Sequence, residues 1–338
     1  MLDALERRRP AAYSLRLRPT IAEFNNESCR YMFRFEHKDL IRLLPCLHLT
    51  VVRTSSGKVC EPEEALLLLC ARLAVPGRWV DHMKLFGGSE GFLSEVFFGI
   101  LKQIHDRFAD RLLNNLGRYS DQFPRWSALV AAKGGAIPNC IGFLDNTKRG
   151  ICRPKRNQHA SYCGYKKKHC LSYQAVISPV GIIFDLNGPH AGFEPDVTCL
   201  VDSTLLTRLE DVCTILARLF VLYADRGYPM HELLWVAHRG AAIGEFEAEW
   251  NRVMNRERTS VEWGYGKVTS LWSYLDHKQQ QKLLLQPVDM HYIVAVILTN
   301  CHTCMNGSVT TSWFQTMAPS LESYLGVFTE QELEDMAA

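Results

Sequence analysis

The chain has 338 residues, of which 47% are hydrophobic and 22% charged, and its 38 Lys and Arg nearly balance 36 Asp and Glu to give a formal net charge of +2. These values exclude a disordered, collagenous or coiled-coil chain, and the length indicates one large domain or two smaller ones. The apolar run 292–298 is too short for the roughly 20 residues of a membrane span, and the N-terminus lacks the apolar stretch of a signal peptide. We therefore expect a soluble intracellular protein with no membrane partner, whose 12 cysteines are reduced thiols in the core.

Helices are predicted first along the chain. One covers 37–44 and stops before Pro45, and the next begins at Pro62 and runs to Ala74. A third helix ends at Gly87-Gly88. The sequence thus predicts a helical region over residues 1–134.

A fourth helix, capped by Ser89, is predicted to reach about residue 116 with one broad apolar face. The break before it resembles a helix-turn-helix. However, the segment 89–101 contains two Glu and neither Lys nor Arg, which is poor chemistry for a helix that faces phosphates. We expect core packing or partner docking there.

From residue 140 onward, short apolar runs typical of strands replace the helical pattern. These runs are 140–144, 171–178, 182–186, 219–224 and 233–237. Helices are predicted between and after them, over 202–218, 246–275 and 290–304. This order predicts an α/β layer architecture. We place this domain at 135–306, after the glycine-rich stretch 132–138, and a partly helical tail at 307–338.

Acidic residues stand at informative positions in the second part. Asp145 follows the apolar run 141–144, and Asp225 follows 219–224, so both carboxylates are expected at the edge of a sheet. Asp196 precedes a helix after the loop 188–195, and Glu262 lies on a long later helix. A single Asp after a strand is often only a turn or cap residue. Four converging acids instead suit two Mg²⁺ ions, which prefer oxygen ligands and act in phosphodiester chemistry.

Positive charge is concentrated between residues 146 and 184, where Asp and Glu are absent. The basic block consists of Lys148, Arg149, Arg153, Lys155, Arg156, Lys166, Lys167 and Lys168. Such runs can be solvated loop surface or protection of an edge strand. The block is long, directly follows Asp145 and is interleaved with Tyr162, Tyr165 and His169. We therefore predict DNA contact that is largely independent of sequence.

A zinc site is the alternative use of this region. Its cysteines and histidines cluster as Cys152, His159, Cys163, His169 and Cys170. A closed zinc site typically shows paired short spacings, whereas the chain has a single Cys-x-x-Cys, at 301–304. The pattern does not favour zinc, and the role of the cluster stays open.

Five segments together resemble successive motifs of the Harbinger-type DDE superfamily endonucleases, which are transposases and their domesticated nuclease relatives. They are 142–147, 164–174, 188–196, 224–229 and 261–267. The resemblance covers about 141–304 and extends more loosely to the helical N-terminus. Two positions depart from it: Asn146 stands where the family usually has Gly, and Pro195 where it has His.

The resemblance implies a ribonuclease H-like fold, with a mixed sheet flanked by helices. In that fold, acids on the first strand, the fourth strand and a late helix bind two Mg²⁺ or Mn²⁺. Matched residue by residue, the catalytic acids are Asp145, Asp225 and Glu262, and Asp196 is a further metal ligand. The implied reaction is in-line attack of water on a DNA phosphodiester, with a freed 3′ hydroxyl as the later nucleophile.

The same resemblance implies a Myb-like DNA-binding partner, entry into the nucleus and a homo-oligomer when active. The rival hypothesis is a catalytically silent descendant that keeps the fold as a DNA-binding or protein-docking module. Glu257 is the alternative to Glu262 as the catalytic acid on the late helix. The two are about 140° apart around a helix. The apolar neighbours of Glu262 favour it, whereas Glu257 between Arg256 and Arg258 is predicted to be a solvated charge.

Overall fold

The protein is described by a computed structural model that covers residues 17–238, 240 and 243–326. By compactness the chain divides into two units. One contains the described residues up to Asp106 with Leu271–Tyr274 and 325–326, and the other contains those of Arg107–Ser270 and Leu275–Tyr324. The domain boundaries expected from the sequence stay a prediction. In the described ranges, no helix is long and apolar enough to cross a membrane.

The first unit is mainly helical. Its elements are η2 (Ile21–Glu23), α1 (Asn26–Phe33), α2 (His37–Cys46), β1 (Val52–Arg53), β2 (Val59–Cys60), α3 (Pro62–Ala74), α4 (Trp79–Phe86) and the first part of α5 (Glu90–Leu113). The predicted helix from Pro62 to Ala74 is confirmed. Helix α2 continues to Cys46, beyond the predicted stop at Pro45. Proline removes only its own N–H, and the Leu47 N–H still bonds to the Leu43 carbonyl.

The break between α4 and α5 is built as the sequence predicted. Gly87 ends α4 with a φ of 67°, which favours glycine, and the Ser89 hydroxyl accepts from the Phe92 N–H at 3.2 Å. The apolar face of α5, including Phe97 and Leu101, is buried. Core packing therefore accounts for this helix.

The remaining elements alternate between strands and helices. The strands are β3 (Cys140–Gly150), β4 (Tyr162–Cys163), β5 (Lys168–Ile177), β6 (Ile183–Ala191), β7 (Val221–Ala224) and β8 (Leu234–Val236). The helices after α5 are η3 (Leu116–Gln122), α6 (Phe123–Ala132), α7 (Gln158–Ser161), α8 (Asp196–Asp202), α9 (Leu205–Leu216), α10 (Glu245–Leu271), η4 (Ser273–Asp276), η5 (Lys278–Gln280), α11 (Val288–Asn306), α12 (Val309–Trp313) and α13 (Leu321–Leu325). The predicted mixed α/β architecture is confirmed.

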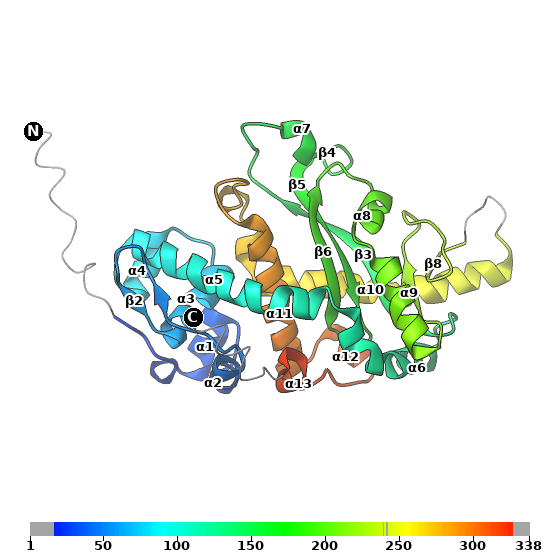
Figure 1. Ribbon diagram of the computed structural model, residues 1–338, viewed down its shortest axis with the longest axis horizontal. Helices are drawn as coiled ribbons and strands as arrows, with labels where there is room; N and C mark the ends of the chain where they lie inside the picture. The colour runs from blue at the N-terminus through cyan, green and yellow to red at the C-terminus, as the bar shows by residue number, and fades with distance from the viewer. Residues whose placement is uncertain (1–16, 239, 241–242, 327–338) are drawn as a thin grey trace, which may run out of the picture. The chain divides into compact units, whose positions relative to one another are not determined.

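Six strands of the second unit form one mixed sheet. The main order is β6-β5-β3-β7-β8, and the short β4 pairs with the start of β5. Strands β3, β5 and β6 are antiparallel, whereas β7 and β8 run parallel to β3. Figure 1 shows β3, β5 and β6 as long neighbouring strands with α10 passing behind them in this view.

Helices cover both faces of this sheet. Because side chains alternate along a strand, neighbouring β3 residues face different helices. Asp145 reaches Arg258 of α10, whereas the next residue, Asn146, reaches Asp196 and Cys199 of α8. Residues 145 and 146 therefore contact helices on opposite faces of the sheet.

Several predicted boundaries differ from the structure, most clearly in the strands; β6, for example, continues to Ala191 and not only to Leu186. Strand β3 continues to Gly150 instead of ending at Leu144, because its polar second half pairs with β5 as far as Cys170. The helix predicted over 202–218 is α9, which begins at Leu205 and ends at Leu216; the separate helix α8 precedes it, and Thr204 between them has a φ of 51°. In β3, pairing with a neighbouring strand overrode the apolar pattern along the chain.

Candidate active site

Parallel pairing of β3 and β7 places Asp145 beside Asp225. Leu144 lies opposite Ala224 in the ladder, and each aspartate is the next residue. Strand β7 ends there, and the chain turns so that the Tyr228 N–H bonds to the Asp225 carbonyl at 3.2 Å. Asp145 remains within β3, paired with Ala175 of β5. Asp145 therefore lies where the pairing of β3 with β7 ends. It does not lie at the end of its own strand, where the sequence predicted it.

Gly227 brings Asp196 next to Asp225. A Cβ at Gly227 would lie 3.0 Å from the Asp196 Oδ2 and 3.3 Å from the Asp225 Oδ1. The Gly227 N–H also donates to the Asp225 carboxylate. Both carboxylates thus lie against this glycine, and any side chain there would push them aside.

Asn146 fixes the orientation of Asp196. Its amide Nδ2 donates to the Asp196 Oδ1 at 2.9 Å, and its Oδ1 accepts from the Ser172 hydroxyl at 2.8 Å. Because the second bond orients the amide, Asn146 presents a donor to the carboxylate. The departure from the Harbinger-type motif at this position therefore has a structural role.

Glu262 is connected to Asp145 through Arg258. On α10, the Arg258 guanidinium lies 3.6 Å from the Asp145 Oδ2 and 3.4 Å from the Glu262 Oε1. The side chain of Glu262 is 56% exposed, more than its apolar sequence neighbours suggested. Tyr265, on the same helix, donates its hydroxyl to the Asp145 carbonyl at 2.7 Å. We refer to Asp145, Asp196, Asp225 and Glu262 as the acid site.

Glu257 is not the solvated charge that the sequence predicted. Its side chain is fully buried, accepts from the Trp313 indole N–H at 2.8 Å and pairs with Arg256 at 3.2 Å. Burial and two partners give it a structural role on α10 away from Asp145. The helical periodicity that separates it from Glu262 was correct, but the sequence did not reveal Trp313.

The electrostatics of the acid site centre on Asp145. Burial raises the pKa of Asp145 to about 6; the charges of Asp225 and Asp196 add to this rise, whereas Arg258 and the Asn146 N–H oppose it. Burial also raises the pKa of Tyr228 well above its usual value, with further contributions from Asp196 and Asp145. The site therefore gathers negative charge in partly desolvated surroundings, which favours a bound cation.

The basic block is divided between surface and interior. Arg153, Lys155, Arg156, Lys166 and Lys167 are exposed. Three others bond within the fold: the Lys148 ammonium contacts the Gly192 and Glu194 carbonyls at 3.2 Å, the Lys168 ammonium contacts the Lys148 carbonyl at 3.3 Å, and Arg149 lies 3.8 Å from Asp276. The exposed members are accessible to a phosphate backbone, although Arg153 also donates to the Gln158 side chain at 3.0 Å.

The cysteines and histidines between residues 152 and 170 do not gather around one point in the described part of the chain. His169 contacts the Ser161 hydroxyl at 3.0 Å, and the His159 ring packs on Phe193. A different group, His190, Glu194 and Cys199, does come together. Sequence reasoning missed this group because its members come from a strand, a loop and a helix. It also missed Arg258, although the four-residue spacing to Glu262 is the usual signal of a helical ion pair.

Comparison with known proteins supports a nuclease. Residues 144–300 match a family model described as DDE superfamily endonuclease. The matched range runs from the residue before Asp145 into α11 and contains the whole acid site. Neither the curated proteins nor the solved structures contain a match to this chain. The similarity over this range indicates a transposase-like nuclease.

Proposed function

We propose that this protein is a divalent-metal-dependent DNA endonuclease of the Harbinger transposase type. One observation carries the proposal: Asp145 and Asp225 follow paired residues where β7 ends beside β3, Asp196 and Asp225 lie against Gly227, and Arg258 connects Glu262 to Asp145. All four acids fall inside the range that matches the endonuclease family.

The acid site suits Mg²⁺ or Mn²⁺. Its donors are carboxylate oxygens, the ligands that hard divalent ions prefer, and burial together with the nearby charges of Asp225 and Asp196 raises the pKa of Asp145. We assign Asp145, Asp196, Asp225 and Glu262 as the ligands of two ions. When bound, such ions neutralise phosphate charge and make water a stronger nucleophile at neutral pH.

Neighbouring residues hold these carboxylates in position. Asn146 orients Asp196, the Gly227 N–H holds Asp225, and the Tyr265 hydroxyl anchors the backbone of Asp145. The single positive charge of Arg258 lies between the carboxylates of Asp145 and Glu262 and holds them near the same part of α10. These contacts restrict the orientation of the carboxylates before a substrate binds.

The sheet supports the ribonuclease H-like part of the proposal. Leaving aside the two-residue β4, Asp145 lies on the first strand of the sheet, Asp225 follows the fourth, and Glu262 lies on a late helix. This is the distribution that the family resemblance implies. Exposed residues of the basic block supply DNA contact, and we further propose a Myb-like partner, a nuclear location and a homo-oligomeric active form.

A nicking assay tests the proposed activity. We expect the protein to nick supercoiled DNA in Mg²⁺ or Mn²⁺, EDTA to prevent nicking, and Asp145→Asn to remove it while the protein stays folded. Metal-dependent nicking that persists in a well-folded Asp145→Asn variant contradicts the site.

Arg258 gives one reason to keep a second candidate, a catalytically silent DNA-binding or docking module. Its guanidinium already supplies positive charge to two of the four acids. A silent module binds DNA without cleaving it and shows no stabilisation by Mg²⁺ or Mn²⁺. Thermal unfolding with and without these ions distinguishes it from the nuclease.

A further inference from the structure

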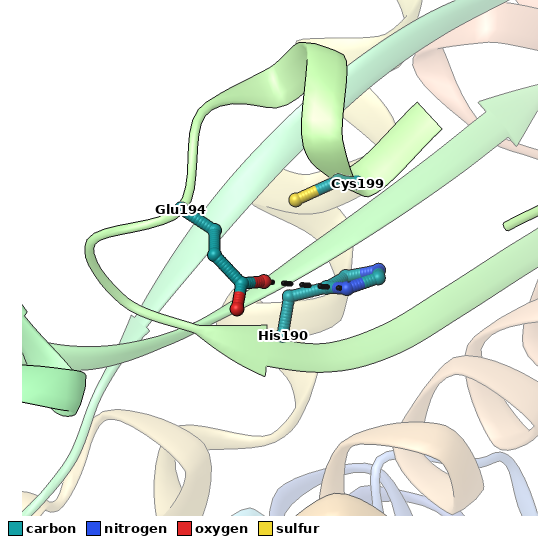
Figure 2. Close-up of side chains that lie close together, drawn as sticks. All are labelled: His190, Glu194 and Cys199. Carbon is teal, nitrogen blue, oxygen red and sulfur yellow. Dashed lines mark ion pairs between the residues drawn. The ribbon is translucent and has the colours of Figure 1, made fainter. Parts of the chain in front are cut away.

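A second cluster of metal-ligating side chains lies close to the acid site but is chemically different. His190 comes from the last part of β6, Glu194 from the following loop and Cys199 from α8. One potential ligand atom from each lies within 4.8 Å of the others. Figure 2 shows the three side chains pointing toward one another, with His190 and Glu194 joined by an ion pair of 3.6 Å.

Two polar atoms of this cluster are buried and have no hydrogen-bond partner in the described part of the chain. The side chain of His190 is only 9% exposed, and its Nε2 has no hydrogen-bond partner in the described part of the chain. The same holds for the Glu194 Oε2, since 3.6 Å to the His190 Nδ1 exceeds a hydrogen bond. Buried polar atoms are nearly always paired, so this cluster lacks a partner that it has the chemistry to bind.

The donor set selects the kind of ion. An imidazole nitrogen, a carboxylate oxygen and a thiolate sulfur together suit Zn²⁺, whereas Mg²⁺ prefers oxygen alone. Zinc bonds of about 2.0–2.3 Å in a tetrahedron separate ligand atoms by roughly 3.3–3.8 Å. The three side chains therefore need to close by about 1 Å. We propose that His190, Glu194 and Cys199 form a zinc-type site with one open position.

The acid site and this cluster share a connecting residue. The Asn146 amide lies 2.9 Å from the Asp196 Oδ1 and 3.4 Å from the Cys199 Sγ. An ion held by Glu194 and Cys199 joins the loop before α8 to the body of that helix, and Asp196 lies between them in sequence. The site thus has a structural consequence, which is to hold the segment that carries Asp196. This inference does not depend on nuclease activity.

Cobalt substitution tests the site on the full-length protein. Metal-free protein is titrated with Co²⁺, whose bond to a thiolate gives a near-ultraviolet charge-transfer band, and Zn²⁺ is then added as competitor. We expect about one equivalent of band-forming Co²⁺, displaced by Zn²⁺. Cys199→Ser removes the band, and His190→Gln or Glu194→Gln lowers the affinity at least about tenfold.

Two controls separate this site from other ligands. Cys152→Ser removes a half-buried thiol outside the cluster, and Asp225→Asn alters the acid site; both variants should keep the band. If Cys199→Ser does not fold, the loop variant Glu194→Gln carries the test. The proposal is overturned if wild-type protein gives no band, if the band survives in folded Cys199→Ser, if Glu194→Gln binds Co²⁺ as tightly as wild type, or if Cys152→Ser loses the band.

Discussion

The Arg258 guanidinium lies 3.6 Å from the Asp145 carboxylate, inside a site that otherwise collects negative charge. It also lies 3.4 Å from Glu262, one helical turn away on α10. Because only 18% of the Arg258 side chain is exposed, solvent screens these contacts incompletely. Arg258 is therefore an internal counter-charge that opposes the binding of a second cation at the same acids.

Removal of this counter-charge should strengthen metal binding. In Arg258→Gln we expect the Mn²⁺ concentration that half-maximally raises the unfolding temperature to fall about tenfold, equivalent to about 1.4 kcal/mol. Without metal, the variant should be less stable than wild type because Asp145 and Glu262 lose their partner. Arg252→Gln is the control, since Arg252 pairs with exposed Glu249 on the same helix. An unchanged Mn²⁺ midpoint in Arg258→Gln contradicts this role.

The raised pKa of Asp145 predicts a pH effect on metal-free protein. The folded carboxyl titrates near 6 and the unfolded one near 3.9, so the folded state binds more protons between these values. Its ionisation therefore destabilises the fold progressively as pH rises from about 4 to 6, by at most about 3 kcal/mol. Asp145→Asn should be more stable than wild type at pH 7 in EDTA, with little difference at pH 4. Thermal unfolding across this range is the measurement, and a difference that does not vary with pH argues against the assignment.

Glu262 and Glu257 should behave oppositely when each is changed. Glu262→Gln is expected to lower Mg²⁺-dependent cleavage by more than about a hundredfold, because metal ligands supply several kcal/mol of charge stabilisation. Its exposed side chain predicts little change in stability. Glu257→Ala should lower the unfolding free energy by about 1–3 kcal/mol, since it leaves the half-buried Trp313 N–H without its carboxylate partner.

The readout for these two variants is the cleavage rate per folded molecule, measured together with urea unfolding. Folded Glu257→Ala should retain wild-type cleavage. Equal loss of cleavage in both variants would mean that α10 presents Glu257, and not Glu262, to the acid site.

Gly227 should be intolerant of even the smallest side chain. In Gly227→Ala the new methyl group contacts the Asp196 and Asp225 carboxylates at 3.0 and 3.3 Å and must displace them by a few tenths of an ångström. We expect a tenfold or greater loss of cleavage with an intact fold, because misplaced catalytic groups are costly. Gly164→Ala is a matched control, since a Cβ there has open space. Equal cleavage by the two variants would contradict the prediction that cleavage depends on the close approach of Gly227 to the two carboxylates.

Exposed lysines of the basic block should govern the salt dependence of DNA binding. Lys166→Gln with Lys167→Gln should weaken binding to unrelated sequences and reduce the slope of log affinity against log salt by about 0.9 for each phosphate that is no longer neutralised. Lys168 is left in place because its ammonium bonds to the Lys148 carbonyl. The control pair, Lys58→Gln with Lys84→Gln, removes two exposed lysines of the other unit. If both pairs alter the slope equally, net charge and not this loop explains binding.

The sequence by itself determined most of the long helices and the central strands, and it predicted the four acids. Apolar runs and helical spacing report whether a residue is buried, and a charge that directly follows a buried strand is visible in the chain. Asp225 after β7 and the helix that begins at Pro62 are of this kind. The motif order around Asp145 added the expected function, because the family resemblance implies acids at these positions.

Only the tertiary structure decided how these residues meet. Asp145 lies beside Asp225 through a ladder between strands that are far apart in the sequence, and Glu257 is buried because Trp313 lies against it. Likewise, His190, Glu194 and Cys199 share no spacing that marks a ligand set. Periodicity along a chain records local burial, whereas contacts between distant elements depend on strand pairing and helix packing, so charge partners and ligand clusters appear only in the folded protein.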